Sequence, residues 1–345
     1  MVGLAPRRPD GLAPPAPREP YVDAASGAWI LSRYAEVALA FRDPRLWPVS
    51  SSGEDDGSER DEHGAQVRRA DVQEALSAAR IETWQTRAAL LADATLSEVP
   101  TGRAVDLLSR FAMPWCLRLG VLATGVSETD AQRLGTLAGN AWAGSGLRRR
   151  AFLRRRRATA AVAALERYFA GSAFPMGRPS FVGMVQTLPR LLASGWLALF
   201  RHPGEVARLR AEPQLLPRAV EELLRYAGIV PRLYRRATAD VDLGSVRVKA
   251  GERVTLLIAS ANRDPDQFPD PNRVDVSRAA TGQLALGLGR SSCAGARMVR
   301  MAFAVSIAAM LGRYARIDLS GPVRWRFGNF CWPLSVPVVL ERQAS

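Results

Sequence analysis

Histidine and cysteine are scarce in this chain of 345 residues, which contains two histidines and three cysteines. His63 and His202 cannot build a multi-histidine metal site, and a serine–histidine–acid triad would have to use one of them. Cys116, Cys293 and Cys331 are odd in number and far apart, which fits a reducing compartment and provides no pattern for a zinc site. Most histidine-based enzyme classes, and a disulfide framework, are therefore not expected.

Long apolar runs and a signal-peptide core are also missing. The most apolar stretch, residues 191–200, falls short of the roughly 18 residues that a membrane span requires, and Arg190 and Arg201 border it. Residues 1–20 are rich in proline and arginine and predict a flexible N-terminal arm. We therefore expect a cytoplasmic protein without a membrane span.

Lysine is nearly absent, yet the formal net charge is +14 because arginine is abundant. This bias matches a high-GC coding sequence as well as it matches any function. The charge favours acidic partners, but it does not predict nucleic-acid binding without interleaved aromatic residues or a known binding fold. With 48% hydrophobic and 23% charged residues, the chain has enough apolar surface to bury a large core.

Helical patterns dominate the first two thirds of the chain, and strand patterns gather late. Helical periodicity covers residues 34–42, most of 67–170 and 181–226, and 294–314. Strands are expected at residues 21–23, 28–32, 241–243, 246–248, 254–258 and 336–340. The pattern predicts a mainly α fold with small β-sheets, and we expect residues 21–345 to form a single domain.

The most informative segment places Cys293 between a glycine-rich loop and an amphipathic helix. The dipole and the unbonded N–H groups at a helix start favour the thiolate form, which can ligate a soft or borderline metal. Gly287, Gly289 and Gly295 permit a tight turn and the close approach of a flat, bulky group. An iron macrocycle fits this pattern better than a small ion does.

The segment resembles the haem-binding loop of the cytochrome P450 family, aromatic-Gly-x-Gly-x-His-x-Cys-x-Gly followed by Ala-Arg. The glycines and Cys293 match in register, while Leu286 replaces the aromatic residue, Ser291 the histidine, and Val299 the alanine before Arg300. The resemblance implies a cytochrome P450 fold and a bound haem b with Cys293 as its axial ligand.

Two further segments in the expected order extend the resemblance. Glu222 to Arg225 is similar to the family's Glu-x-x-Arg helix, and residues 268–273 are similar to the segment whose arginine, here Arg273, completes a buried ion network. The resemblance implies that Arg235 holds a haem propionate, since a buried carboxylate needs charge-assisted donors. His63 and Arg68 match the other propionate donors with spacing that departs from the family's.

The central helix of the family carries an acid–alcohol pair that relays protons to bound dioxygen. By the resemblance, Thr187 matches the alcohol, Gln186 stands in place of the acid, and Pro189 is expected to kink or break the helix. An amide cannot deliver a proton as a carboxylic acid does. A substrate that supplies its own carboxyl group near the iron, or a reaction that begins with hydrogen abstraction or decarboxylation, would remove this need.

Two regions look shortened relative to the family: the loop before the His63 helix, and residues 171–180 between the arginine-rich helix and the central helix. A more open pocket and a bulky substrate are expected. Seven arginines, Arg148 to Arg150 and Arg154 to Arg157, would attract an acidic peptide, a carrier protein or a carboxylate, or they form a solvated helix face.

The leading hypothesis is a bacterial haem-thiolate oxidoreductase that tailors a bulky, acidic, peptide-like natural product by oxidative decarboxylation or hydroxylation. Electrons are expected from an acidic ferredoxin that docks on the basic proximal face, and the substrate is carrier-bound in one version of the hypothesis. A peroxide-using or redox-neutral haem enzyme is the first alternative. A haem-free scaffold that supports a partner enzyme is the second alternative. The presence of Cys293 among Gly287, Gly289 and Gly295 argues against it.

Overall fold

The computed structural model describes residues 19–49, 70–144, 152–170 and 177–343. The chain divides into two compact units, one of residues 1–65, 204–293 and 329–331, and another of residues 66–203, 294–328 and 332–345. The expectation of a single domain over residues 21–345 stays a prediction. Within the described ranges, no helix combines the length and apolar character needed to cross a bilayer.

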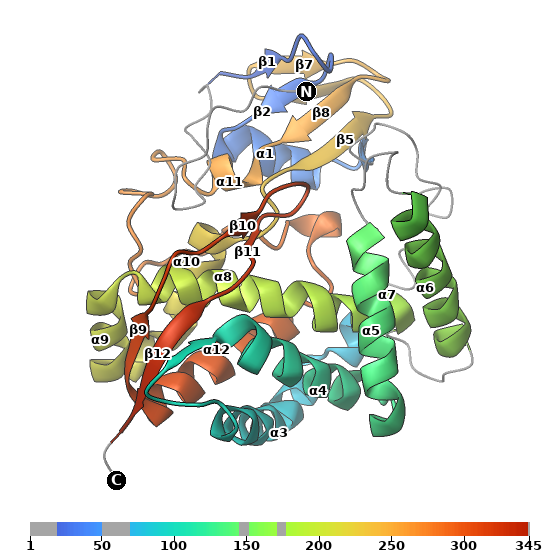
Figure 1. Ribbon diagram of the computed structural model, residues 1–345. Helices are drawn as coiled ribbons and strands as arrows, with labels where there is room; N and C mark the ends of the chain where they lie inside the picture. The colour runs from blue at the N-terminus through green and yellow to red at the C-terminus, as the bar shows by residue number, and fades with distance from the viewer. Residues whose placement is uncertain (1–18, 50–69, 145–151, 171–176, 344–345) are drawn as a thin grey trace. The chain divides into compact units, whose positions relative to one another are not determined.

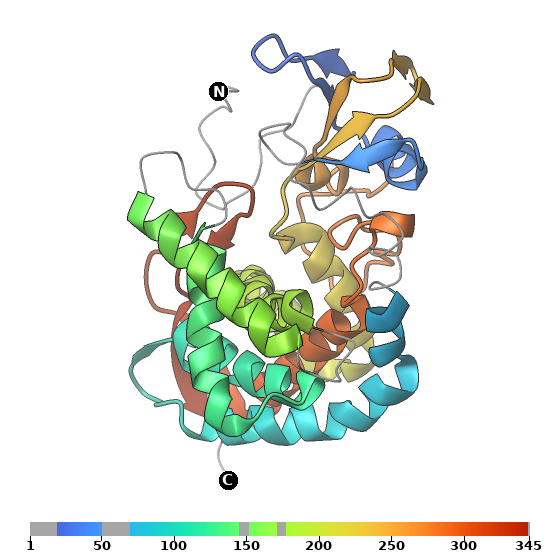
Figure 2. The same ribbon diagram turned by 90° about the vertical axis from the view of Figure 1, so that its right-hand side faces the viewer.

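A five-stranded sheet organises the first unit, and α1 (Tyr34–Arg42) lies on one face of it (Figures 1 and 2). In spatial order the strands are β1 (Tyr21–Val22), β2 (Trp29–Leu31), β8 (Arg253–Leu256), β5 (Leu233–Ala237) and β3 (Leu46–Pro48). The β2–β8 pair is parallel and the other pairs are antiparallel.

The predicted N-terminal hairpin and helix are confirmed. At the turn the Asp23 carboxylate accepts the Ser26 N–H at 2.8 Å, and Gly27 adopts a φ of 64°, a conformation that favours glycine. In α1, Val37 and Phe41 are buried against strand residues, which explains why the helical periodicity located this element correctly.

The remaining elements of the first unit are short helices and one hairpin. The helices are α9 (Pro203–Ala211), η3 (Pro213–Leu215), α10 (Leu216–Ala227), α11 (Ile258–Ala261) and η4 (Gly289–Ser291). Strands β6 (Val241–Leu243) and β7 (Val246–Val248) form a hairpin with the predicted bounds. The strand predicted to reach Ile258 ends earlier, because Ile258 begins α11.

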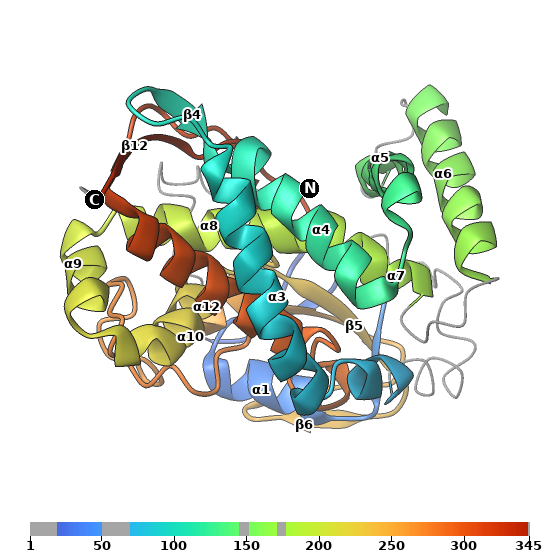
Figure 3. The same cartoon turned by 90° about the horizontal axis from the view of Figure 1, so that it is seen from below.

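The second unit is mostly helical, and α3 lies between α12 and α4 (Figure 3). Its helices are α3 (Ala78–Ser97), η1 (Leu108–Ala112), α4 (Met113–Thr124), α5 (Glu128–Gly144), α6 (Phe152–Ala170), α7 (Gly177–Val182), η2 (Gly183–Thr187), α8 (Leu188–Phe200) and α12 (Ala296–Arg313). Gly125 ends α4 with a φ of 66°, and the Ser127 hydroxyl caps the next helix by accepting the Asp130 N–H at 3.2 Å.

Two small sheets complete the second unit. Strand β12 (Pro337–Arg342) pairs with β4 (Ala104–Asp106) on one side and β9 (Tyr314–Leu319) on the other. Strands β10 (Trp325–Arg326) and β11 (Trp332–Pro333) form a separate two-stranded ladder. The prediction of a mainly α fold with small sheets is confirmed. Of the two expected shortenings, the loop before the His63 helix lies outside the described residues, and so do residues 171–176.

Candidate functional site

The loop before Cys293 is a compact turn that presents this thiol to solvent. Gly287 and Gly289 have φ values of 70° and 56°, so the left-handed backbone expected of the glycine frame is present at both. The Cys293 N–H donates to the Leu286 carbonyl at 2.6 Å, which closes the loop, and the Cys293 side chain is exposed. Gly295 has a φ of −84°, which other residues adopt, so its backbone does not require glycine.

The surroundings of Gly287 are more crowded than those of Gly289, so we expect their alanine variants to differ in stability. A Cβ on Gly287 would lie 2.5 Å from the Ser291 carbonyl oxygen, whereas a Cβ on Gly289 would lie 3.7 Å from the nearest atom, the Phe41 oxygen. We expect Gly287→Ala to lower the free energy of unfolding by about 1–3 kcal/mol more than Gly289→Ala does, because a backbone clash is added to the shared cost of positive φ. Equal denaturation midpoints for the two variants would contradict this geometry.

Asn262 connects the Cys293 loop to the rest of the first unit through hydrogen bonds. The Leu284 N–H donates to the Asn262 Oδ1 at 2.7 Å, and the Asn262 carbonyl accepts from Arg225 Nη1 at 2.8 Å. At the end of α10, Gly228 has no room for a side chain, since a Cβ there would lie 2.7 Å from that of Ala285. The position of the Cys293 loop is therefore fixed by contacts with α10 and α11.

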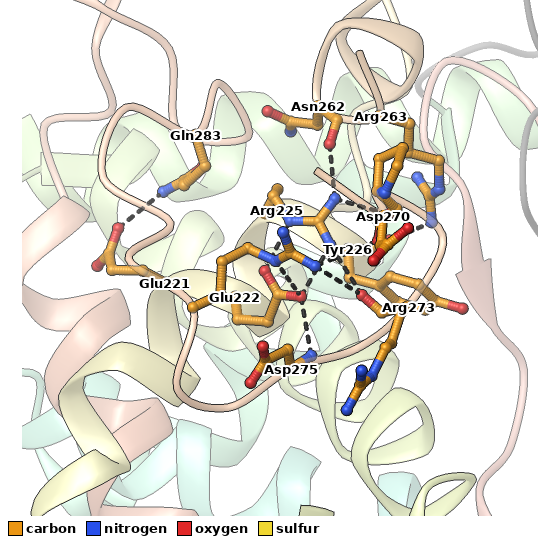
Figure 4. Close-up of polar contacts among 12 residues, drawn as sticks. Glu221, Glu222, Arg225, Tyr226, Asn262, Arg263, Asp270, Arg273, Asp275 and Gln283 are labelled. Atoms are coloured by element: carbon orange, nitrogen blue, oxygen red, sulfur yellow. Dashed lines mark hydrogen bonds and ion pairs between the residues drawn. The ribbon is translucent and has the colours of Figure 1, made fainter. Parts of the chain in front are cut away.

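A buried ion network surrounds Arg225 (Figure 4). Its second arginine differs from the expected one. Glu222 accepts from Arg225 Nε at 2.6 Å and from Arg225 Nη2 at 2.8 Å, and neither side chain is exposed. Arg278 Nε donates to the same carboxylate at 3.1 Å. The prediction that Arg273 completes the network was wrong: its side chain is exposed, and only its backbone carbonyl accepts from Arg225, at 3.3 Å.

Arg235 lies beside the same loop. Alternation along β5 buries Arg235 and exposes Arg236, and Arg235 Nη2 donates to the Ser291 hydroxyl at 3.2 Å. Ser291 occupies the position of the family's histidine, so Arg235 and that position are brought together. The other expected propionate donors, His63 and Arg68, lie outside the described residues.

These residues fit a haem bound through its iron. The Cys293 thiol is exposed on the glycine-containing loop, and a buried guanidinium beside Ser291 suits a propionate. Cys116 does not fit such a role, because it is buried and burial raises the pKa of its thiol well above the ordinary value.

The expected acid–alcohol positions lie in a π-helical turn of the second unit. Elements α7, η2 and α8 follow one another without a break, so Pro189 does not interrupt the helix; a π-helical turn ending at Thr187 precedes it instead. Thr187 is half-buried and Gln186 is buried. The helix distortion expected at Pro189 is therefore a π-helical turn rather than a break.

Both polar atoms of the Gln186 side-chain amide form hydrogen bonds. Its Nε2 donates to the Gly135 carbonyl on α5 at 3.4 Å, and its Oε1 accepts from Arg190 Nη1 at 3.0 Å. Arg190 was not identified from the sequence as a site residue. The signal was present, since Arg190 is the one charged residue in α8 and follows Gln186 by four positions, which places both on the same helix face.

The arginine run is described only in part. Arg148 to Arg150 lie outside the described residues, and Arg154, Arg156 and Arg157 have exposed side chains near the start of α6. Both interpretations of this run, an attractive surface for acids and a solvated helix face, agree with this exposure.

Comparisons with known proteins agree with this geometry. A family model described as Cytochrome P450 matches residues 207–320. Cytochrome P450-SU2 of Streptomyces griseolus is 31% identical over an alignment of 346 positions that covers 86% of this chain and 83% of that protein. Cytochrome p450 CYP199A2 of Rhodopseudomonas palustris is 37% identical over 150 residues, 43% of this chain and 36% of that relative's length.

A solved structure shows the same fold. The crystal structure of P450BioI, in complex with an acyl carrier protein ligated to hexadec-9Z-enoic acid, superposes with a TM-score of 0.81 at 23% identity, over 93% of this chain and 94% of that one. The relative from Streptomyces griseolus aligns along most of both chains, and the glycine-framed cysteine and the Glu-x-x-Arg network are both in place. The chain therefore belongs to the cytochrome P450 family of haem-thiolate oxidoreductases.

Proposed function

We propose that this protein hydroxylates or oxidatively decarboxylates a bulky, acidic, peptide-like natural product. The observation that carries the proposal is the loop geometry around the exposed Cys293, with the buried Arg235 bonded to Ser291 on the same loop. A thiolate can ligate haem iron, and a guanidinium can donate charge-assisted hydrogen bonds to a propionate.

Bound haem b would supply the iron that activates dioxygen. Cys293 would hold the iron as its axial ligand, and Leu286, Gly287, Gly289 and Gly295 would form the surface on the thiolate side. Arg235 would donate charge-assisted hydrogen bonds to a propionate. His63 and Arg68 complete the proposed propionate donors.

By the family resemblance, the Thr187 hydroxyl would position dioxygen or a water molecule. Gln186 has no carboxyl proton to give, and its amide is held between Gly135 and Arg190. An acidic substrate whose reaction begins with hydrogen abstraction or decarboxylation would remove the need for an acid at this position, which is the reason for proposing an acidic substrate.

Acidic protein partners are part of the proposal. Arg290, Arg297 and Arg300 flank Cys293 in the sequence and have exposed side chains, which suits an acidic ferredoxin as the electron donor. The exposed arginines of α6 suit an acidic carrier protein that presents the substrate, and P450BioI has been solved with such a carrier.

The experiment that tests this function measures reduction of the protein and conversion of the substrate as two separate steps. We expect NADPH, a ferredoxin and its reductase to reduce the protein, as shown by formation of the carbon monoxide complex. With dioxygen, acidic peptides should then show one of two mass changes. In hydroxylation the product gains one oxygen atom and the other leaves as water; in oxidative decarboxylation the product loses carbon dioxide and two hydrogen atoms, and both oxygen atoms leave as water. Colourless purified protein would contradict the function and favour a haem-free scaffold.

A peroxide-using enzyme is the second candidate, and the amide at Gln186 is the observation that favours it. Peroxide brings its own protons and electrons, so it needs no acid at this position. Turnover with hydrogen peroxide, together with none from ferredoxin and dioxygen, would establish this second candidate and overturn the first.

A further inference from the structure

Two arginines and two tryptophans from separate elements meet in the second unit. Trp142 is on α5, Arg190 is on α8, and Arg326 faces Trp332 across the β10–β11 ladder. The guanidinium carbon of Arg190 lies 5.8 Å from the ring centre of Trp142 and 5.5 Å from that of Trp332. The guanidinium carbon of Arg326 lies 5.4 Å from the Trp332 ring centre. Arg190 therefore contacts both indole rings, and the two guanidinium groups share the Trp332 ring.

The cluster carries two positive charges and no compensating acid. No carboxylate of the described part of the chain pairs with Arg190 or Arg326. Burial lowers the pKa of Arg190 to about 10, and the charge of Arg326 adds to this shift. Arg190 still carries its proton near neutral pH, so two like charges are held together at a cost that a bound anion would offset.

Gln186 orients Arg190 and leaves part of its guanidinium group available. Arg190 Nη1 donates to both the side-chain and the backbone oxygen of Gln186. Nε and Nη2 have no acceptor among the described residues. One nitrogen of Arg190 is held by Gln186 and its guanidinium group packs on indole rings, so the directions of its remaining N–H groups are fixed. A carboxylate can accept hydrogen bonds from two such N–H groups at once.

We propose that Arg190 and Arg326 bind the carboxylate of this protein's substrate, and that Gln186 is the positioning residue that orients Arg190. The anion would lie against the two guanidinium groups beside the Trp142 and Trp332 rings, whose centres are 6.0 Å apart, rather than on the solvated arginines of α6. This inference rests on the proposed function for its substrate class, and it assigns to Gln186 a role other than proton delivery.

The test is isothermal titration calorimetry with matched acids and amides. The probes are decanoic acid, N-acetylphenylalanine and an acetylated apolar tripeptide, each used as the carboxylic acid and as its primary amide. We expect acids to bind roughly tenfold more tightly than their amides, because each charge-assisted hydrogen bond to an ionised group contributes more than a neutral one.

Three variants test the assignment and one serves as a control. Arg190→Gln and Arg326→Gln should each remove most of the acid preference, and Arg326 is exposed, so its variant keeps the test valid if Arg190→Gln fails to fold. Gln186→Glu should also remove most of the acid preference although both arginines remain, because its own carboxylate would pair with Arg190 in place of the substrate's. Arg154→Gln removes an exposed arginine of α6 and should leave the preference unchanged.

The outcomes separate this inference from the proposed function. Equal affinity for acids and amides, no binding of any probe, or a preference that survives in both arginine variants overturns the inference. A loss in Arg154→Gln as large as in Arg190→Gln overturns it as well, because general attraction to a basic surface would then explain it. Calorimetry needs no turnover, so acid preference without a carbon monoxide band would contradict the function and leave the inference standing.

Discussion

Replacement of Cys293 by alanine abolishes the red-shifted Soret band that the reduced protein forms with carbon monoxide. The band requires a thiolate ligand on the iron, and Cys293 is the cysteine that the glycine loop exposes. The measurement is the difference spectrum between the reduced protein with and without carbon monoxide. We expect complete loss of the thiolate-type band, because no other side chain of this loop can replace the sulfur.

Cys331→Ala is the matched control. Cys331 is partly exposed, and its backbone N–H donates to the Ile229 carbonyl at 2.8 Å, a hydrogen bond that alanine retains. Its variant should show the full band. A band that persists in Cys293→Ala, or that disappears in Cys331→Ala, would show that the wrong cysteine has been assigned.

Replacement of Glu222 by alanine lowers the free energy of unfolding by about 3–5 kcal/mol, the cost of breaking a buried ion pair by removing one partner. The Glu222 carboxylate accepts from Arg225, from Arg278 and from the Asp275 N–H at 3.0 Å. Its loss leaves the fully buried Arg225 guanidinium without a counter-charge. Chemical denaturation followed by circular dichroism measures the change.

Arg273→Ala is the control that separates the observed network from the expected one. The exposed Arg273 side chain adds nothing to the network, and its backbone carbonyl remains in the variant, so we expect a change within about 0.5 kcal/mol. Arg278→Ala should destabilise the protein much more. The reverse order would show that Arg273, as the sequence first indicated, is the network arginine.

Local sequence patterns are sufficient to predict the features that depend on neighbouring residues. Examples are the helix at residues 34–42, the strands at 241–243 and 246–248, and the cap at Ser127. Each of these features depends on backbone conformation within a few residues. The glycine frame of Cys293 is local in the same way, because the positive φ values of Gly287 and Gly289 follow from a turn of one short segment.

Contacts between residues far apart in the sequence could not be predicted from local patterns and depend on how the chain packs. Short strands such as β3 and β5 lack a strong pattern of their own and exist through their pairing, and β2 pairs in parallel with β8 from the far part of the chain. The choice of Arg278 over Arg273 depends on how the segment after α11 folds back onto Glu222. The cluster of Arg190 with Trp142 and Trp332 joins three segments that no spacing rule connects, since packing and desolvation, rather than local propensity, bring them together.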